Sequence, residues 1–394
     1  MAPEAARAMP EIPAPYQSDV SVEPVRGPRD LDHFVKLQWQ IYQGDPHWVA
    51  PLLMERRDFL NPRKNPFYRH GVVELFLARR QGQVVGRIAA VEDRNYNEFH
   101  GTNQGAFGLF ECIDDPDVAQ ALLSAAEAWI QARGLSSVMG PLSFSTNYEC
   151  GLLVDGFDRD PAVMMAYNPR YYRALIEGAG YRKAKDLWAF WVDAQKEPDA
   201  KVARVADKIR AKQGIVVRPA NLKNFSAEVA LLKKVYNAAW EKNWGFVPFT
   251  DEEFDHLAKD MKQIVKPELL LIAEVAGEPV AFSMSLPDAN QALKHAKGRL
   301  FPTGLVKLLY YANKIDQARL ITLGIVPGYR RRGLDAILTL ETLRAARRLG
   351  YRGGEISWTL EDNDLVNRAI ESFGGEKTKT YRVYEKALAE GSAR

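Results

Sequence analysis

The chain has 394 residues with 53 Lys and Arg against 50 Asp and Glu, a net charge of +3. A chain of this length exceeds the usual size of one hydrophobic core, so two domains are expected. Because the charges nearly balance, the protein as a whole has little electrostatic attraction for nucleic acid, and no nucleic-acid partner is expected. Two cysteines are too few for a disulfide framework, and the six scattered histidines offer no zinc spacing. We therefore expect a cytoplasmic protein without a metal site. Since no apolar run approaches the ~20 residues that span a bilayer, no membrane partner is expected.

After an Ala- and Pro-rich tail, residues 1–19, which is predicted to be disordered, the chain shows an internal repeat. Two apolar strands flank a glycine turn in Leu75–Val91, and the same pattern returns in Leu270–Leu286, 195 residues later. Both hairpins follow a strand-then-helix pattern. The first of these patterns covers Val20–Val25 and Leu31–Tyr42, and the second covers Ile215–Arg218 and Phe225–Trp240.

Each half also carries a helix that ends at a glycine. The spacing of apolar residues predicts helices over Val118–Arg133 and Asp335–Leu349. These helices lie 216 residues apart, so each half holds an insertion that the other lacks, Gly140–Tyr167 in the first and Pro287–Asn313 in the second. The fold class expected is α/β, with two tandem domains that each have a mixed sheet flanked by helices. The predicted boundaries are 20–195 for the first domain, 196–214 for a linker helix and 215–390 for the second domain.

One segment, from Arg319 to Leu338, has the pattern of an anion site. An apolar strand leads through Pro327-Gly328 and three arginines to Gly333 and an amphipathic helix. The first backbone N–H groups of a helix have no partner within it, and their dipoles favour an anion. A pyrophosphate suits such a turn, because glycine lets the backbone approach the phosphates closely.

This segment resembles the acyl-CoA signature of the GNAT superfamily of N-acyltransferases, with Arg330 and Gly333 at the signature positions and Val326 displaced by one place. The resemblance covers the second half well and the first half only as topology. It implies that the strand edge pairs with the pantetheine arm of acetyl-CoA or another acyl-CoA, that amides of the turn hold its pyrophosphate, and that an asparagine further on contacts the arm. The CoA-binding residues implied in this way are Leu323, Ile325, Val326, Arg330, Arg331, Arg332, Gly333, Leu334, Asp335 and Asn363.

Two positions depart from the family pattern. Asp335 stands where the family has a second Gly or Ala, and its charge opposes a pyrophosphate, although three arginines leave the turn positive. Ile370 stands where many members carry a tyrosine general acid. Glu361, at the end of a strand, is our candidate general base, with a helix-capping acid as the alternative.

The remaining candidates concern the acceptor. In the first insertion, Ser145, Asn147 and Glu149 are either substrate contacts or part of an irregular connection. The resemblance places the region of Trp240, Asn243 and Trp244 along the acceptor pocket; the alternative is an aromatic core. In the second insertion, Lys294, Lys297 and Arg299 are either a solvated loop or a contact for an acidic group.

The first half lacks the anion site. Asp114 and Asp115 stand at its corresponding turn and would repel a pyrophosphate, so this half is expected to bind no CoA. The leading function is transfer of an acetyl or longer acyl group from acyl-CoA to a small-molecule or peptide amine, by direct attack in a ternary complex. Two alternatives stay open: Fem-type aminoacyl transfer from aminoacyl-tRNA, and a non-catalytic module that binds CoA or another ligand.

Overall fold

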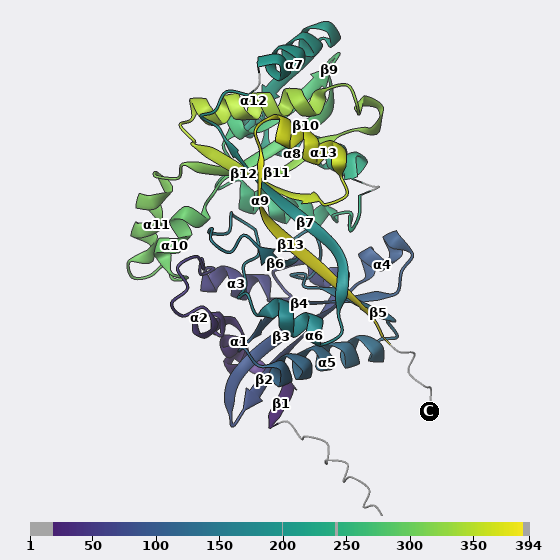
Figure 1. The fold of residues 1–394 in the computed structure, drawn as a ribbon, viewed down its shortest axis with the longest axis vertical. Coiled ribbons are helices and arrows are strands. Elements are labelled where there is room, and N and C mark those ends of the chain that lie inside the picture. The colour runs from purple at the N-terminus through teal and green to yellow at the C-terminus, as the bar shows by residue number, and fades with distance from the viewer. Residues whose placement is uncertain (1–18, 199, 241–242, 389–394) are drawn as a thin grey trace, which may run out of the picture.

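The computed structural model describes residues 19–198, 200–240 and 243–388 (Figure 1). Apart from Asp19, the predicted disordered tail lies outside the described residues. The first half contains β1 (Val20–Pro24), α1 (Gly27–Lys36), α2 (Gln38–Ile41), α3 (Leu53–Phe59), β2 (Gly71–Arg80), β3 (Gln83–Asp93), α4 (Arg94–His100), β4 (Gln104–Cys112), α5 (Pro116–Ala132), β5 (Ser137–Gly140), β6 (Leu152–Asp155), α6 (Tyr172–Gly178) and β7 (Arg182–Asp193).

The second half repeats this order with its own insertion. It contains α7 (Ala200–Gln213), β8 (Ile215–Pro219), α8 (Phe225–Trp240), α9 (Asp251–Met261), β9 (Leu270–Val275), β10 (Glu278–Pro287), α10 (Asn290–Ala296), α11 (Gly304–Ala312), β11 (Gln317–Ile325), α12 (Leu334–Arg348), β12 (Gly353–Leu360), α13 (Asp364–Ser372) and β13 (Glu376–Ala387).

The strands of both halves form one continuous sheet rather than two separate ones. Its order is β1-β2-β3-β4-β5-β13-β7-β12-β11-β10-β9-β8, with β6 paired to β13. The halves exchange their last strands: β7, from the first half, pairs with β12, whereas β13, from the second, pairs with β5. The long antiparallel pair of β7 and β13 crosses the middle of the molecule (Figure 1). The predicted α/β fold class is thus confirmed, and the two sheets expected from the repeat are joined by this exchange.

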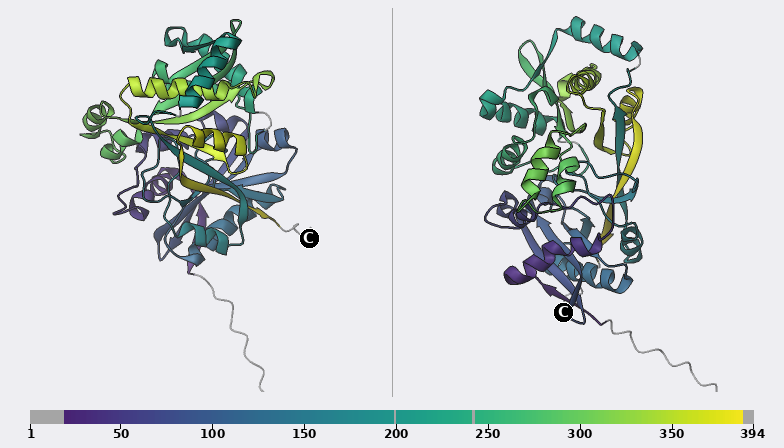
Figure 2. Two further views of the ribbon diagram at one scale, coloured as in Figure 1. Left: turned by 45° about the horizontal axis from the view of Figure 1, so that its top comes forward. Right: turned by 90° about the vertical axis from the view of Figure 1, so that its left-hand side faces the viewer.

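Each half buries its apolar faces between the sheet and its helices. In the first half, α5 presents Leu122, Ala126 and Ile130 to β2, β3 and β4, and these side chains are fully buried. In the second half, α12 and α7 pack together on one side of the sheet, while α8 covers β10 and β11 with a different set of buried residues. Two helix layers therefore enclose the second half's strands, as Figure 2 shows from two directions.

The predicted elements are confirmed with shifts of a few residues. The two hairpins are β2–β3 and β9–β10, and the two glycine-ended helices are α5 and α12. The predicted linker helix is α7. Of the insertions, residues 140–167 contain β6 and otherwise irregular chain, whereas residues 287–313 form the helical hairpin of α10 and α11.

Candidate functional site

Strands β11 and β12 separate part of the way along their length. They pair in parallel from Gln317 and Gly353 to Leu320 and Ile356, and the pairing stops there. Beyond this fork, β11 continues beside β10 as far as Ile325, and β12 continues beside β7. The fork leaves a stretch of β11 edge without a neighbouring strand, and backbone groups on such an edge can pair with an extended ligand.

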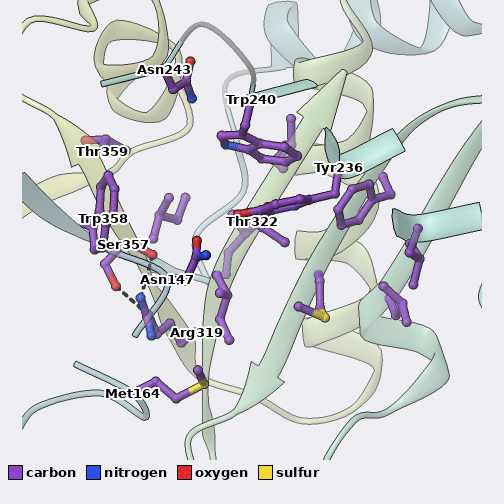
Figure 3. Close-up of a pocket in the computed structure, with 18 of the residues that line it drawn as sticks. Asn147, Met164, Tyr236, Trp240, Asn243, Arg319, Thr322, Ser357, Trp358 and Thr359 are labelled. Atoms are coloured by element: carbon purple, nitrogen blue, oxygen red, sulfur yellow. Dashed lines mark hydrogen bonds between the residues drawn. The ribbon is translucent and has the colours of Figure 1, made fainter. Parts of the chain in front are cut away.

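A cavity of about 370 Å³ opens at this fork. Figure 3 shows Trp358 and Thr359 on one side of it and Tyr236 and Trp240 on the other. Helices α8 and α9 contribute a broad apolar wall. That wall includes Phe225, Val229, Leu232, Tyr236, Trp240, Phe254, Leu257 and Met261.

The N-terminus of α12 borders the same cavity. Its N-cap is Gly333, with φ 80° and ψ 11°, and no side chain caps the helix. Asp335 and Ala336, in the first turn, line the cavity. The first amides of a helix have no partner within it, so those of α12 are available to an anion. A positive φ at Gly333 is easy only for glycine, which explains why this residue type stands at the turn.

The three arginines near this turn have different surroundings. The guanidinium of Arg330 donates to the carbonyl oxygen of Ala239 at 2.6 Å and to that of Ile325 at 3.4 Å, and so ties the turn to α8. Arg332 lies over the ring of Tyr329, 4.8 Å from its centroid. Arg331 and Arg332 are exposed. Arg330 therefore has a structural contact in addition to the CoA contact predicted for it.

A buried charged network lies at the base of the fork, where the sequence analysis identified no candidate. Arg319, on β11, donates to the Ser357 hydroxyl at 2.8 Å (Figure 3). It also donates to the Val163 carbonyl at 2.7 Å. Ser357 donates to Glu355 at 2.7 Å, and Glu355 pairs with Lys379 at 2.8 Å. Burial lowers the pKa of Arg319, while the charge of Glu355 opposes this shift. Since Arg319 and Ser357 both line the cavity, the network fixes the fork at the point where the two strands separate.

Of the ten predicted CoA-binding residues, three line the cavity and seven do not, among them Arg330, Arg331, Arg332 and Gly333. Leu323, Asp335 and Asn363 line the cavity. Asn363 also caps α13, because its side chain accepts a hydrogen bond from the amide of Val366 at 3.4 Å. Leu334 is fully buried in the core beneath α12, and Ile325 and Val326 pack against that same core. These three residues lie outside the cavity wall, so any contact with a ligand would be through their backbone.

Glu361 faces away from the cavity wall. Its carboxylate accepts from the Lys183 ammonium at 2.6 Å and from the Asp186 amide at 3.0 Å, both on β7. Its role as a general base stays a prediction, and this geometry favours a structural contact between β12 and β7. Ile370, at the position of the absent tyrosine, is buried against Phe190 and Val192 and borders the cavity.

Most of the predicted acceptor residues gather at the cavity. Trp240, Asn243, Trp244 and Asn147 line it. The Asn147 amide group donates to the Val247 carbonyl at 3.1 Å, which joins the first insertion to the second half. Two other predicted contacts lie elsewhere. Ser145 is buried and accepts from the Asn147 amide, and Glu149 forms an ion pair with Arg56.

A buried histidine links the two halves beside this region. His70 contacts Asp93 through Nδ1 and Glu253, on α9, through Nε2, both at 3.1 Å. Burial lowers the pKa of His70, but the hydrogen bond to Asp93 and the ion pair with Glu253 outweigh burial and raise the pKa to about 9. The hydroxyl of Tyr148, a cavity residue, lies 3.4 Å from Glu253. The charged His70 therefore holds α9, one wall of the cavity, against the first half.

The chain is similar in sequence, over more than nine tenths of its length, to two known proteins. No family model matches the chain. The chain is 39% identical over 379 residues to a bacterial ceramide synthase of Caulobacter vibrioides, covering 94% of this chain and 98% of that protein. It is 37% identical over 368 residues to protein YghO of Escherichia coli, covering 91% of this chain and 93% of that protein.

Two solved structures similar to the chain are GNAT proteins. A tandem GNAT protein from the clavulanic acid biosynthesis pathway matches with a TM-score of 0.56 and 10% identity, over 95% of this chain and all of that one. A GCN5-related N-acetyltransferase from Sphaerobacter thermophilus matches with a TM-score of 0.52 and 15% identity, over 94% of this chain and 96% of that one. The GNAT fold predicted from the sequence is confirmed, and the details of the signature stay a prediction.

Proposed function

Because the chain belongs to the family of the bacterial ceramide synthase of Caulobacter vibrioides and protein YghO of Escherichia coli, we propose that it is an N-acyltransferase that forms the amide of a ceramide-like lipid. In this reaction the amine of a long-chain amino alcohol attacks the carbonyl carbon of a fatty acyl thioester. The new C–N bond forms as the C–S bond breaks, the thiolate leaves, and the amine loses a proton. Acyl-CoA is the donor we propose, on the basis of the open turn before α12.

The observation that carries this proposal is the continuity of the cavity. A single cavity reaches from the first turn of α12, at Asp335 and Ala336, past the fork to the apolar wall of α8 and α9. An anion-binding helix end, a free strand edge and an apolar wall suit, in that order, the pyrophosphate, the pantetheine arm and an alkyl chain. The aromatic wall supports a lipid substrate over a short polar amine, since burying a long chain needs an apolar surface of this kind.

Thr322 is the residue we assign to the reacting carbonyl. The Thr322 hydroxyl is buried and has no hydrogen-bond partner. The residue lies just past the fork, on the stretch of β11 that no longer pairs with β12. Thr322 also lines the cavity. A hydroxyl in that position can donate to the oxygen that becomes negative during attack, and a single donor of this kind contributes on the order of 10²–10³ in turnover.

The test is an assay with palmitoyl-CoA and sphinganine, in which mass spectrometry detects the amide and a thiol reagent detects released CoA. We expect Thr322→Val to reduce turnover by about 100-fold while leaving CoA affinity unchanged. Ser285→Ala is the matched control, because the Ser285 hydroxyl is also buried and unpartnered but lies outside the cavity wall. If CoA binds but a broad panel of amines yields no amide, the protein is a ligand-binding module instead.

A further inference from the structure

The helical hairpin in the second insertion carries an unusual concentration of exposed apolar side chains. Eleven large apolar residues are exposed among those that the structure describes, and five of them fall within residues 301–310. These five are Phe301 at 75% exposure, Leu305 at 37%, Val306 at 70%, Leu309 at 60% and Tyr310 at 57%. Leu305, Val306, Leu309 and Tyr310 follow helical spacing, so they form one stripe along α11. A water-facing helix would normally place polar residues on this side.

The same segment is strongly basic. Between Asp288 and Asp316 the sequence contains no acidic residue and five basic ones, Lys294, Lys297, Arg299, Lys307 and Lys314. Lys307 lies in α11 itself, between the apolar residues, and Lys314 donates to the Tyr310 hydroxyl at 2.8 Å just beyond its end. Apolar side chains interspersed with lysine and tyrosine are typical of helices that lie in a membrane interface.

The hairpin projects from the side of the molecule but is firmly anchored. Figure 1 and the left panel of Figure 2 show α10 and α11 at an outer edge, away from the central strands. The Leu53 amide donates to the Gly298 carbonyl at 3.0 Å, and the Trp39 indole donates to the Lys297 carbonyl at 3.4 Å. Contacts with the first half therefore hold the exposed stripe in place.

The base of the hairpin lies next to the cavity. The Asp288 carboxylate, just before α10, accepts from the Val163 amide at 2.8 Å, and Asn290 donates to the Pro161 carbonyl at 2.9 Å. Met164, the next residue after Val163, lines the cavity. A surface that binds the hairpin would thus be close to one side of the site.

We propose that α11 and the loop before it dock the protein on the surface of a membrane that contains anionic lipids. The apolar stripe would enter the boundary between headgroups and acyl chains, and the exposed Lys297, Arg299, Lys307 and Lys314 would attract the negative surface. Lys294 is paired with Asp160 at 2.6 Å and is not part of this attraction. The contact proposed is a peripheral one, made by a nine-residue helix and the loop before it. In the described part of the chain, no helix is long and apolar enough to cross a bilayer. This proposal replaces the expectation of no membrane partner and does not depend on the proposed function.

The charge of the segment argues against a second copy of the chain as the occupant. A symmetric dimer places the same patch on both sides, so two segments that each carry four exposed basic residues would face each other. A stable protein interface also buries on the order of 1,200–2,000 Å² in total, far more than one nine-residue helix supplies. An anionic lipid surface satisfies both the apolar and the basic side chains.

The test is sedimentation of the full chain with vesicles of phosphatidylcholine alone or of phosphatidylcholine mixed with phosphatidylglycerol. We expect binding to the mixed vesicles, reduced roughly tenfold or more by Val306→Glu with Leu309→Glu. Lys307→Glu with Lys314→Glu should weaken binding to the mixed vesicles about tenfold and binding to neutral vesicles less. Val216→Glu is the control, because Val216 is also an exposed apolar residue, at 56%, but lies on β8.

Failure of the wild-type chain to bind the mixed vesicles would overturn the proposal, as would unchanged binding by the Val306 and Leu309 double variant. A wild-type dimer in solution that this variant converts to a monomer would instead identify the stripe as a contact between copies. CoA affinity of the same variant, measured without vesicles, should equal that of the wild type. Loss of vesicle binding at unchanged CoA affinity therefore separates docking from the proposed acyl transfer.

Discussion

The two halves use one scaffold but begin their equivalent helices in opposite ways. In the first half, the Asp115 carboxylate caps α5 by accepting from the amides of Asp117 and Val118. In the second half, Gly333 leaves the start of α12 without a side-chain cap and next to the cavity. A helix end that is closed by its own carboxylate has no amide left for an external anion. The difference supports the prediction that only the second half binds an anion at this helix end.

The strand forks differ in the same sense. In the first half, β4 and β5 pair in parallel only from Gln104–Ser137 to Ala106–Met139, as β11 and β12 do in the second. Beyond that point the chain itself occupies the edge of β4, because the Leu142 amide donates to the Phe107 carbonyl at 2.8 Å. A Cβ atom at Gly108 would meet the Leu142 carbonyl oxygen at 1.7 Å, so the backbones are in close contact. The first half thus fills with its own chain the position that the second half leaves open.

The largest effect is expected when the start of α12, in the second half, is given the aspartate cap found in the first half. We expect Gly333→Asp to weaken CoA binding on the order of 100-fold, because the carboxylate would occupy the amides of α12 and repel the pyrophosphate. Titration calorimetry with CoA measures the effect. Gly333→Asn is the control: it meets the same positive φ and the same Ile209 side chain, at 3.0 Å from a Cβ, without the charge. Equal losses in both variants would show that strain or occupation of the amides, and not charge, governs the site.

The link between the halves should depend on pH. The folded-state pKa of His70, about 9, is above its ordinary value of 6.5. Its contribution to stability is therefore complete below pH 6.5 and is lost as pH rises through about 9. We expect the free energy of unfolding to fall over this interval by about 1–3 kcal/mol more in the wild type than in His70→Gln. Denaturant titrations at a series of pH values measure this difference, and identical pH profiles would contradict it.

Removing the cap of the first half should affect stability alone. We expect Asp115→Ala to cost about 1 kcal/mol in the free energy of unfolding, since α5 loses its cap and Arg80 loses a partner at 2.7 Å. CoA affinity should stay the same. Asp114→Ala, one residue earlier and outside the cap, is the control for the loss of a charge. A gain or loss of CoA binding in Asp115→Ala would mean that the first half takes part in the CoA site.

The smallest effect is expected at Glu361. Because its carboxylate is engaged by Lys183 and by the Asp186 amide, we expect Glu361→Gln to change turnover by less than about threefold. Steady-state kinetics with saturating acyl-CoA measures this change. A loss of about 10²–10⁴-fold, together with loss of the acidic limb of the pH–rate profile, would instead establish Glu361 as the base.

Local patterns in the sequence predicted much of the second half. The strand, turn and helix around Gly333 are contiguous, so their residue types alone indicated an anion site, and the cavity reaches that helix. The network of Arg319, Ser357, Glu355 and Lys379 was not predicted, because its members come from three strands whose neighbours depend on the tertiary fold. The exchange of β7 and β13 was missed for the same reason, since each strand has the same apolar pattern whichever half it completes. For Glu361, the sequence predicted its position at the end of a strand. It did not predict that the side chain contacts β7, because that contact depends on the tertiary fold.

The strand exchange also sets the order in which the molecule can be completed during synthesis. The free edge of β5 pairs with β13. The sheet that begins in the earliest part of the chain is therefore completed by residues 376–387, which are synthesised much later. Until then, β5 and β7 each expose an edge that can pair with other strands. The sheet of the amino-terminal half is therefore completed only once β13 has been synthesised. A chain shortened before β13 should lose structure first at β5, β6 and β7, which belong to the other half of the molecule.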